Sequence, residues 1–452
     1  MAKNQKLGIF DCTMIVVSLV IGMGIFRTPV NVAQKAPDSF LFFFTWIAGG
    51  LVAICGALTY AEIGSRLPVT GGYYKVFSYG YHPSIAFAIN CIILISNAAS
   101  LAGATLIGSE YISRILFPNL VDLSAIQSRE IIISVLAILV FYGVNLMGLK
   151  MSARAQNVLT VIKITLIVLL ITPLFFADRN PVAQENLLVS PGWLAYLKGF
   201  GAGLIAVSFT YGGYQQTINF GSDVENPSRN IPRAIFMGMF IIIVLYLSIN
   251  YAYIRVIGFD RLGHTKGIAA VMAEHVFGAA AGKILSILLF LSVLAYINVL
   301  LMSNPRVMYA MAEDGVLPRL FAKKQASTGV LLTSLTVFAG VCVVIIFWMK
   351  AFDKILSFTI FLDCFGMAAS AATIFKLRKQ KVKPVGKEIY AMRLFPLLPV
   401  VFIAAYSFVA ISISLDSPYT ALTALVVMGA FMLVYFLGLR SKDRNPPAGQ
   451  AH

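Results

Sequence analysis

Two glycine-rich stretches interrupt apolar segments that are long enough to cross a membrane. Gly22-Met23-Gly24 lies near the middle of the first such segment, and Gly212-Gly213 interrupts a matching segment in the second half of the chain. The hydrocarbon core offers no water to an interrupted backbone, so a non-helical stretch at membrane depth survives only against protein or a polar cavity. Two interruptions at corresponding places in two halves therefore indicate a binding site between them.

The first interruption has the chemistry of an anion site. Glycine tolerates backbone conformations that other residues resist, so we expect the helix to unwind around Gly22 and Gly24. A new helix then begins beyond the break, and its free N–H groups and positive dipole end attract an anion such as a carboxylate. The alternative is that the glycines only allow close packing of helices.

The second interruption offers hydrogen-bond acceptors. It reads Phe209-Thr210-Tyr211-Gly212-Gly213-Tyr214-Gln215-Gln216, with two glycines between aromatic and amide side chains. Unwound carbonyls would accept hydrogen bonds from an ammonium group, and the aromatic rings could close over a small ligand. A polar packing seam is the alternative, but the coincidence with the first interruption favours a binding site.

Lys163 falls about halfway along another apolar segment. A lysine at this depth costs about 2.5–3.5 kcal/mol on insertion scales, so it must face the protein interior and find carbonyls or an acid. A fixed cation there could replace a bound sodium ion, or it could exchange a proton. Snorkelling to an interface is the alternative, but both interfaces are far away.

Asp363 is the second charge inside an apolar segment. Three interpretations stay open: the carboxylate lines a substrate pocket, it pairs with a cation, or it lies nearer the outer interface. Other polar residues in these segments need no substrate, because hydrogen bonds between helices, worth about 1 kcal/mol or less, account for them. These residues are Asn97, Ser292, Tyr296 and Asn298.

Composition identifies the elements that position these residues as membrane helices. Of the 452 residues, 59% are hydrophobic and 12% are charged, whereas a soluble domain is about a quarter charged. A spanning helix needs about 20 apolar residues. The sequence predicts an all-α protein with twelve spans, at roughly 8–33, 40–64, 84–116, 130–149, 154–177, 198–220, 233–257, 283–311, 330–349, 354–377, 392–414 and 418–439.

The net charge of +16 is explained by membrane topology and does not require a nucleic acid partner. With the N-terminus inside, most of the 35 Lys and Arg residues fall on the cytoplasmic side, so the bias predicts that both termini are cytoplasmic. All cysteines lie within apolar spans, which leaves no loop pair for a disulfide and no metal cluster. They are Cys12, Cys55, Cys91, Cys342 and Cys364.

The spans divide into two halves of similar length, 8–177 and 198–377, and each half begins with its glycine-interrupted helix. Five spans per half place the second half upside down relative to the first. This pattern predicts an inverted repeat, with 392–439 as two added spans and 440–452 as a cytoplasmic tail.

Five motifs in order resemble the amino acid–polyamine–organocation superfamily, and within it the L-type amino acid transporter branch. The resemblance covers about residues 8–377 and supports the same five-plus-five inverted repeat. It rests on Ile21–Pro29 (IGMGIFRTP), Pro68–Tyr74 (PVTGGYY), Phe209–Tyr214 (FTYGGY), Glu225–Ile235 (ENPSRNIPRAI) and Asn304–Pro318 (NPRVMYAMAEDGVLP).

The resemblance also implies roles for individual residues. A substrate carboxylate would sit on the backbone of Gly22, Met23, Gly24 and Ile25, and the α-ammonium group would meet the carbonyls of Val20, Ile21 and Phe209. The Phe209 ring matches an aromatic gate, Gly212 would face the substrate side chain, and Tyr211, Gly213 and Tyr214 complete this site. Lys163 matches a lysine that bridges spans one and eight in place of a cation, with Ser292 and Tyr296 as its span-eight partners.

The sequence departs from the family pattern at several places. Met23 replaces a hydroxyl residue, so only backbone amides remain for the carboxylate, and Tyr296 stands where a small hydroxyl residue is usual. Asp363 replaces an uncharged residue, so substrate specificity cannot be transferred. The loop 117–129 lacks the cysteine by which animal members bond a heavy chain, so no such partner is expected.

These observations predict a transporter of the cell membrane rather than an enzyme, with no cofactor. We expect sodium-independent exchange of small or medium neutral L-amino acids by alternating access. Proton-coupled uptake through Lys163 and transport of a cationic amino acid or amine, suggested by Asp363, are the alternatives with the same fold. A sensor or a channel is a further alternative, but the sequence shows no signalling domain.

Overall fold

The computed structural model describes residues 6–118, 122–176, 192–265, 267–347, 352–379 and 389–438. In this part the chain is helical, and the β-type pairing consists of isolated bridges between Leu7 and Val224 and between Thr70 and Phe220. The predicted tail at 440–452 lies outside the described residues.

The helices of the first half follow the predicted spans. They are α1 (Ile9–Val20), η1 (Gly24–Phe26), α2 (Thr28–Lys35), α3 (Ser39–Arg66), α4 (Gly72–Gly80), α5 (Pro83–Leu116), α6 (Leu123–Leu146), α7 (Leu149–Ile171) and η2 (Thr172–Phe175).

The second half and the C-terminal part are built in the same way. Their helices are α8 (Trp193–Tyr211), η3 (Tyr214–Asn219), η4 (Gly221–Asp223), α9 (Pro227–Ile257), α10 (Phe259–Leu262), α11 (Ile268–Phe277), η5 (Gly278–Ala280), α12 (Ala281–Glu313), η6 (Arg319–Ala322), α13 (Leu332–Phe347), α14 (Phe352–Lys379), α15 (Leu397–Asp416) and α16 (Pro418–Gly438).

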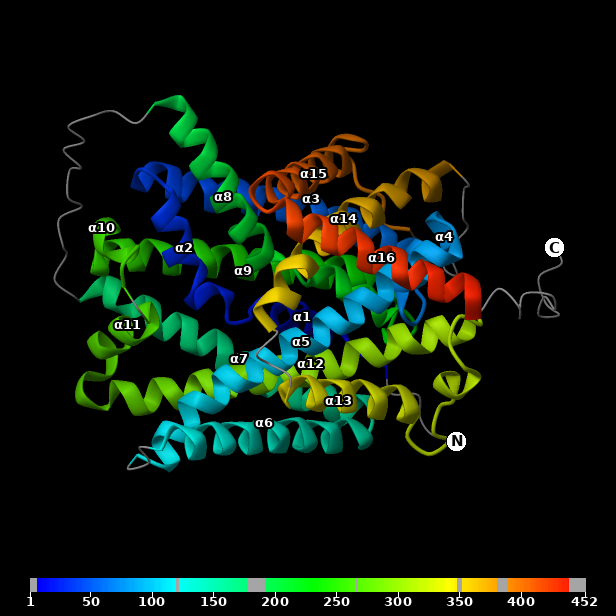
Figure 1. Ribbon diagram of the computed structural model, residues 1–452, viewed down its shortest axis with the longest axis horizontal. Coiled ribbons are helices and arrows are strands. Elements are labelled where there is room, and N and C mark those ends of the chain that lie inside the picture. Colours follow the sequence, from blue (N-terminus) through cyan, green and yellow to red (C-terminus); the bar gives the residue numbers. More distant parts are fainter. Residues whose placement is uncertain are drawn as a thin grey trace.

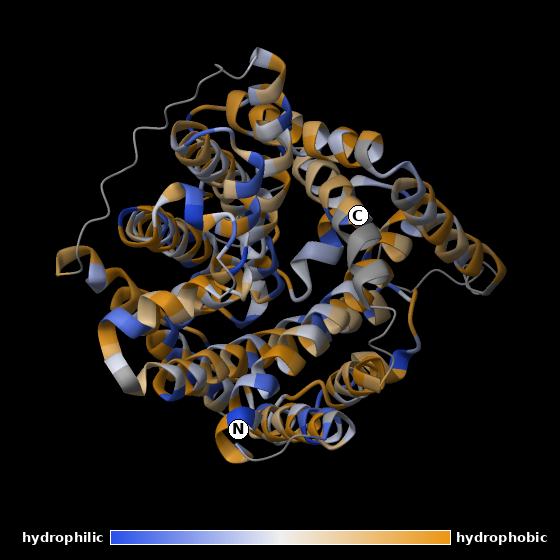
Figure 2. Ribbon diagram, turned by 60° about the vertical axis from the view of Figure 1, so that its left-hand side comes forward, coloured by the Kyte–Doolittle hydropathy of each residue, from blue (hydrophilic) through white to orange (hydrophobic). Residues whose placement is uncertain are grey.

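Among the described residues, 8 helices are long and apolar enough to cross a membrane. They correspond to α3, α5, α6, α7, α8, α9, α12 and α15, and shorter apolar helices include α1, α13 and part of α16. Hydrophobic residues, drawn in orange, make up much of most helices (Figure 2). The chain is therefore a multi-pass membrane protein, as predicted, and the total of twelve spans stays a prediction.

Both predicted interruptions are present. Helix α1 ends at Val20, Ile21 is extended, and the chain turns through η1 before α2 begins at Thr28. Helix α8 ends at Tyr211, Gly212 is extended, and Gly213 has a φ of +116°. A Cβ at Gly213 would lie 2.3 Å from the carbonyl oxygen of Leu19, so both the backbone angle and the close approach of the chain require glycine there.

The interrupted helices are surrounded by the long ones. Helix α1 packs against α7, α9 and α12, and α8 packs against α2 and α3. Helices α6, α12 and α13 contact one another along the lower edge of Figure 1, and α5 crosses them obliquely. On the other side α14 packs against α5 and α15. The breaks thereby lie within the bundle, next to other helices.

One end of the bundle carries clustered arginines, and we call it the basic end; it holds Arg66, Arg306 and Arg378. The buried carboxylate of Glu62 accepts hydrogen bonds from Arg66 Nε at 2.8 Å and from Arg378 Nε at 2.8 Å. Arg306 forms an ion pair with Asp223 at 2.7 Å. The Glu62–Arg378 pair joins α3 to α14, and the Arg306–Asp223 pair joins α12 to η4.

Candidate functional site

The first interruption leaves backbone donors unused. Gly22 N–H donates to Val20 O at 2.8 Å and Phe26 N–H donates to Met23 O at 3.2 Å. Among the described residues, the N–H groups of Met23 and Ile25 have no acceptor. Gly22 and Met23 are partly exposed, and no atom lies within 4 Å of a Cβ built on Gly22. This arrangement of free amides beside open space can bind a carboxylate.

The second interruption lies directly beside the first. Gly213 approaches the backbone of Leu19, and a Cβ on Gly24 would lie 3.3 Å from the Thr210 side chain. The hydroxyls of Thr28 and Thr210 share a hydrogen bond of 2.7 Å. The structure therefore brings together the backbone of the two stretches that the sequence singled out.

The carbonyls predicted to accept the ammonium group already have donors: Ile21 O and Phe209 O have one each, and Val20 O has two, because Gly22 N–H also donates to it. Ile21 O accepts from Lys163 Nζ at 2.6 Å, Val20 O accepts from Tyr246 Oη at 3.3 Å, and Phe209 O accepts from Gly212 N–H at 3.2 Å. Ile21 O and Phe209 O each keep a second lone pair. Gly212 O accepts no hydrogen bond from the described residues. It is an additional acceptor that the sequence interpretation did not select.

The aromatic residues around the second interruption point in different directions. The Phe209 side chain is 48% exposed, whereas those of Tyr211 and Tyr214 are 1% and 0% exposed. The Tyr211 ring packs against Trp46 and Tyr246 in the core. Of these three rings, only Phe209 is available to a ligand, and the two tyrosines can contribute only backbone groups in this conformation.

Lys163 is fully buried on α7. Its Nζ donates to Ile21 O at 2.6 Å and to Ser18 Oγ at 3.4 Å, and Ser18 Oγ donates to Ala295 O of α12 at 3.4 Å. The lysine therefore reaches α12 through Ser18. No hydrogen bond joins it to Ser292 or Tyr296, the two partners that the family resemblance implied.

Tyr296 bonds to another helix because its side chain is longer than the small hydroxyl that the family pattern expects. Its hydroxyl shares a hydrogen bond of 2.9 Å with Ser100 of α5. Asp363 lies on another helix, α14. The Asp363 side chain is half-buried.

A layer of amide and hydroxyl side chains lies between the interruptions and the basic end, and we call it the amide layer. Asn97 Nδ2 donates to Asn304 Oδ1 at 2.7 Å, and Gln216 Nε2 donates to Asn97 Oδ1 at 3.3 Å. Asn219 Nδ2 donates to Ser303 Oγ at 3.0 Å. These bonds connect η3 to α5 and α12. The sequence showed the amides after Gly213 but not their partners.

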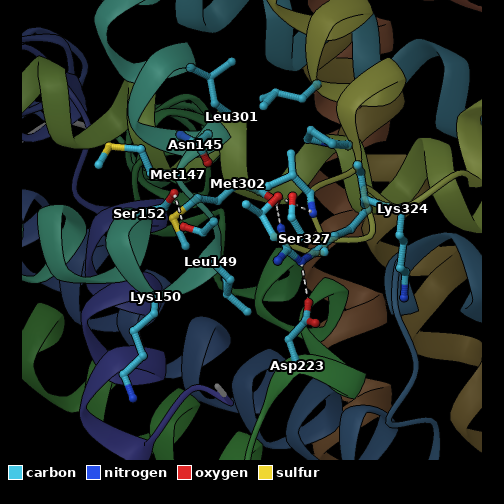
Figure 3. Close-up of a pocket in the computed structure, with 18 of the residues that line it drawn as sticks. Asn145, Met147, Leu149, Lys150, Ser152, Asp223, Leu301, Met302, Lys324 and Ser327 are labelled. Atoms are coloured by element: carbon cyan, nitrogen blue, oxygen red, sulfur yellow. Dashed lines mark hydrogen bonds and ion pairs between the residues drawn. The ribbon is translucent and has the colours of Figure 1, made fainter. Parts of the chain in front are cut away.

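A pocket of about 560 Å³ opens on the far side of the amide layer, at the basic end. Asp223 forms its ion pair with Arg306 in the wall of this pocket. In Figure 3, Met302 and Ser152 lie above Asp223, and the Lys324 side chain lies at one edge. Met302 lines this pocket, and the next residues of α12, Ser303 and Asn304, belong to the amide layer. The pocket therefore adjoins the amide layer along α12.

Known proteins resemble this chain along nearly its whole length. The sequence model of the amino acid permease family matches residues 7–434. A serine/threonine exchanger of Bacillus subtilis is 26% identical over 98% of this chain and 98% of its own length. Asc-type amino acid transporter 1 of Mus musculus is 24% identical over 98% of this chain and 83% of its own. Large neutral amino acids transporter small subunit 2 of Homo sapiens is 24% identical, over 97% and 81%. All three are transporters and none is an enzyme.

Proposed function

The chain belongs to the amino acid permease family, and we propose that it exchanges amino acids across the cell membrane, without sodium, by alternating access. One observation carries the proposal: two interrupted helices place free donors and a free acceptor beside each other. The N–H groups of Met23 and Ile25 fit a carboxylate, and Gly212 O fits an ammonium group. A zwitterionic amino acid needs this pairing. Because Met23 has no side-chain hydroxyl, backbone N–H groups would hold the substrate carboxylate.

Independence of sodium is supported by the position of Lys163. Its ammonium group bonds to Ile21 O and Ser18 Oγ, two oxygens of the kind that would coordinate a cation. A fixed positive charge at this place repels a second cation. The lysine therefore takes over the structural role of a bound sodium ion.

The side of the bundle toward which the site is open supports an outward-facing conformation. By the positive-inside rule, the basic end is cytoplasmic, and both termini are then cytoplasmic. The amide layer closes the route toward that end, while Phe209 is exposed on the other side. Lys198 lies on the same face of α8 as Phe209 and is exposed. The pocket at the basic end would then be the start of the cytoplasmic exit.

The same proposal includes the repeat organisation, with inverted halves at 8–177 and 198–377, two further spans at 392–439 and twelve spans in total. Each half contains one interrupted helix, and both interruptions meet at one site, which supports the repeat. The loop 117–129 has no cysteine, so we propose that the chain works without a disulfide-linked partner.

Small or medium neutral amino acids are the proposed substrates. Open space beside Gly22 and partial exposure of Gly212 provide room for a side chain. The serine/threonine exchanger is a relative whose named substrates have this size. A cationic amino acid or amine is the second candidate, and a carboxylate within an apolar segment, that of Asp363, favours it.

Uptake into proteoliposomes tests the mode of transport. Purified protein is reconstituted, and uptake of radiolabelled serine is compared between vesicles preloaded with serine and empty vesicles, in sodium and in choline buffers. An exchanger gives uptake only into preloaded vesicles, equally in both buffers. Equal uptake into empty vesicles would contradict the exchange mechanism, and a requirement for sodium would contradict the proposed role of Lys163.

Proton-coupled uptake through Lys163 is the alternative mode. The observation that favours it is the absence, among the described residues, of an acidic partner for this buried lysine. This alternative predicts that a pH gradient drives accumulation into empty vesicles and that Lys163→Ala abolishes the drive. Transport by Lys163→Ala that equals the wild type under every condition would exclude both roles of the lysine.

A further inference from the structure

The pocket at the basic end gathers positive charge from four separate parts of the chain. Lys6 precedes α1, Lys150 lies in the first turn of α7, Arg306 lies on α12, and Lys324 follows η6. Among the described residues that line the pocket, Asp223 is the one carboxylate. The lining therefore carries three more positive charges than negative ones.

The charge of the three lysines is not neutralised by the wall of the pocket. Arg306 Nε donates to Asp223 Oδ2 at 2.7 Å, so the carboxylate is paired with the arginine. None of the ion pairs formed by the described residues includes Lys6, Lys150 or Lys324. In Figure 3, Lys150 and Lys324 lie on opposite sides of Asp223. Two of the unpaired cations thus lie on different walls of one cavity.

Helix α7 begins at one of these walls. Its N-cap, Gly148, and its first two residues, Leu149 and Lys150, line the pocket. Gly148 has no side chain that could cap the helix, and the N–H groups of Leu149 and Lys150 have no acceptor in the described part of the chain. The free N–H groups and the positive dipole end of a helix favour an anion. They add to the charge of the Lys150 side chain on this wall.

A tight turn at residues 325–330 forms another wall. Gln325 N–H donates to Val330 O at 2.9 Å, and Gly329 N–H donates to Gln325 O at 2.8 Å, which closes the turn. The residues inside it, 326–328, line the pocket, and no described residue accepts a hydrogen bond from their N–H groups. Successive free N–H groups in a turn form a concave site for an anion. The turn directly follows Lys324.

The lining therefore offers hydrogen-bond donors and positive charge from more than one direction. A phosphate group matches this arrangement, because it carries up to two negative charges and its oxygens can accept hydrogen bonds from different sides. The pocket volume of about 560 Å³ falls within the range of small-molecule sites, about 300–1,000 Å³. It therefore leaves room for the remainder of a phosphate ester.

We propose that the pocket at the basic end binds a phosphate group, carried by a soluble phosphate ester or by the headgroup of an anionic lipid. Lys150 and the N-terminus of α7 hold the phosphate from one wall, and Lys324 and the turn 325–330 hold it from another. This ligand is not the transported amino acid, so the inference goes beyond the proposed function.

Binding of radiolabelled inorganic phosphate to the purified full chain tests the site. Equilibrium dialysis is carried out in a buffer of low ionic strength and repeated with added salt, because salt screens exposed charges. We expect saturable binding of one phosphate per chain, weakened by salt. Absence of saturable binding by the wild type would overturn the inference.

Competition identifies the source of the phosphate group. Glycerol 3-phosphate and dioctanoyl phosphatidic acid carry the same phosphate ester, without and with acyl chains. Displacement of the radiolabel at lower concentrations of the lipid would identify a lipid headgroup as the ligand. Displacement by the soluble ester at equal or lower concentrations would identify a soluble ligand. Failure of both to displace the radiolabel would contradict recognition of a phosphate ester.

A pair of double variants assigns the binding to this pocket. Lys150→Gln/Lys324→Gln removes one charge from each of two walls, and we expect the affinity for phosphate to fall at least about tenfold, about threefold per exposed lysine. Lys323→Gln/Lys379→Gln removes the same charge from two exposed lysines that do not line the pocket, and it should bind phosphate as the wild type does. An equal loss of affinity in both double variants would show a response to overall charge and would overturn the assignment.

The phosphate measurements contain no amino acid, so their failure is distinct from failure of the proposed function. If serine is exchanged in proteoliposomes but phosphate does not bind, the inference is wrong and the proposed function stands. If phosphate binds as expected but serine is not exchanged, the phosphate site stands and the proposed function must be revised.

Discussion

Lys163 Nζ donates a hydrogen bond of 2.6 Å to the carbonyl oxygen of Ile21, the residue at which α1 stops being helical. This bond explains how a broken helix is stable inside the membrane. The break exposes a carbonyl that the helix no longer satisfies, and the ammonium group on α7 satisfies it. The same bond gives the buried lysine an acceptor, so the two unfavourable features compensate each other.

Replacement of this lysine tests the relationship. Lys163→Met keeps most of the volume of the side chain but leaves Ile21 O and Ser18 Oγ without their donor. Loss of a buried donor costs about 1–3 kcal/mol, so we expect the initial rate of serine exchange to fall at least about fivefold. Lys283→Met, at an exposed position near the start of α12, should exchange serine normally. Wild-type rates in Lys163→Met would show that the bond has no functional role.

Gly213 should tolerate no side chain. Its φ of +116° is unfavourable for other residues, and a Cβ would lie 2.3 Å from Leu19 O. Gly213→Ala must therefore move α1 away from the second interruption, and we expect loss of exchange together with a lower melting temperature. Gly340→Ala on α13, where no atom lies within 4 Å of a Cβ, is the control and should retain both. A normal melting temperature in Gly213→Ala would contradict the close approach.

Gly22 should respond differently, because nothing lies within 4 Å of a Cβ built on it and its φ is not positive. The added methyl group of Gly22→Ala fits the unliganded protein but occupies space beside the free amides. We expect an unchanged melting temperature without substrate and weaker binding of serine, seen as a smaller increase of the melting temperature at saturating serine. An unchanged response to serine would place the substrate elsewhere.

The positions of both interruptions could be predicted from the sequence, because closely spaced glycines weaken a helix in the middle of an apolar segment and occur in both halves of the chain. The burial of Lys163 followed from the cost of a charge at membrane depth. Family membership was also predictable, since the motifs extend along most of the chain, and the match over residues 7–434 confirms it.

Side-chain directions could not be predicted in the same way. Tyr211 and Tyr214 flank the glycines in sequence, but their rings pack against residues of α3, including Trp46 and Gly56, that are distant in the chain. The link from Lys163 to α12 through Ser18 likewise depends on how three helices pack. Such contacts between distant segments leave no pattern in a single sequence.

The amide layer should control access to the basic end. Hydrogen-bonding side chains can exchange their partners for water when a passage opens, whereas apolar side chains would be exposed at a cost. Asn97 and Asn304 form its shortest bond, at 2.7 Å. Asn97→Ala and Asn304→Ala should each lower the stability of the outward-facing state and reduce serine exchange. In a double-mutant cycle on stability, we expect a coupling of about 1 kcal/mol.

Asn250 on α9 provides the control for this cycle, since its Nδ2 donates to Tyr246 O within its own helix at 2.7 Å. The effects of Asn97→Ala and Asn250→Ala should add, because separate sites that share no partner are independent. The measurement is the free energy of unfolding in one detergent, with serine exchange measured in parallel. Additive effects of Asn97→Ala and Asn304→Ala would mean that the two amides do not act together, and the layer would then be ordinary helix packing.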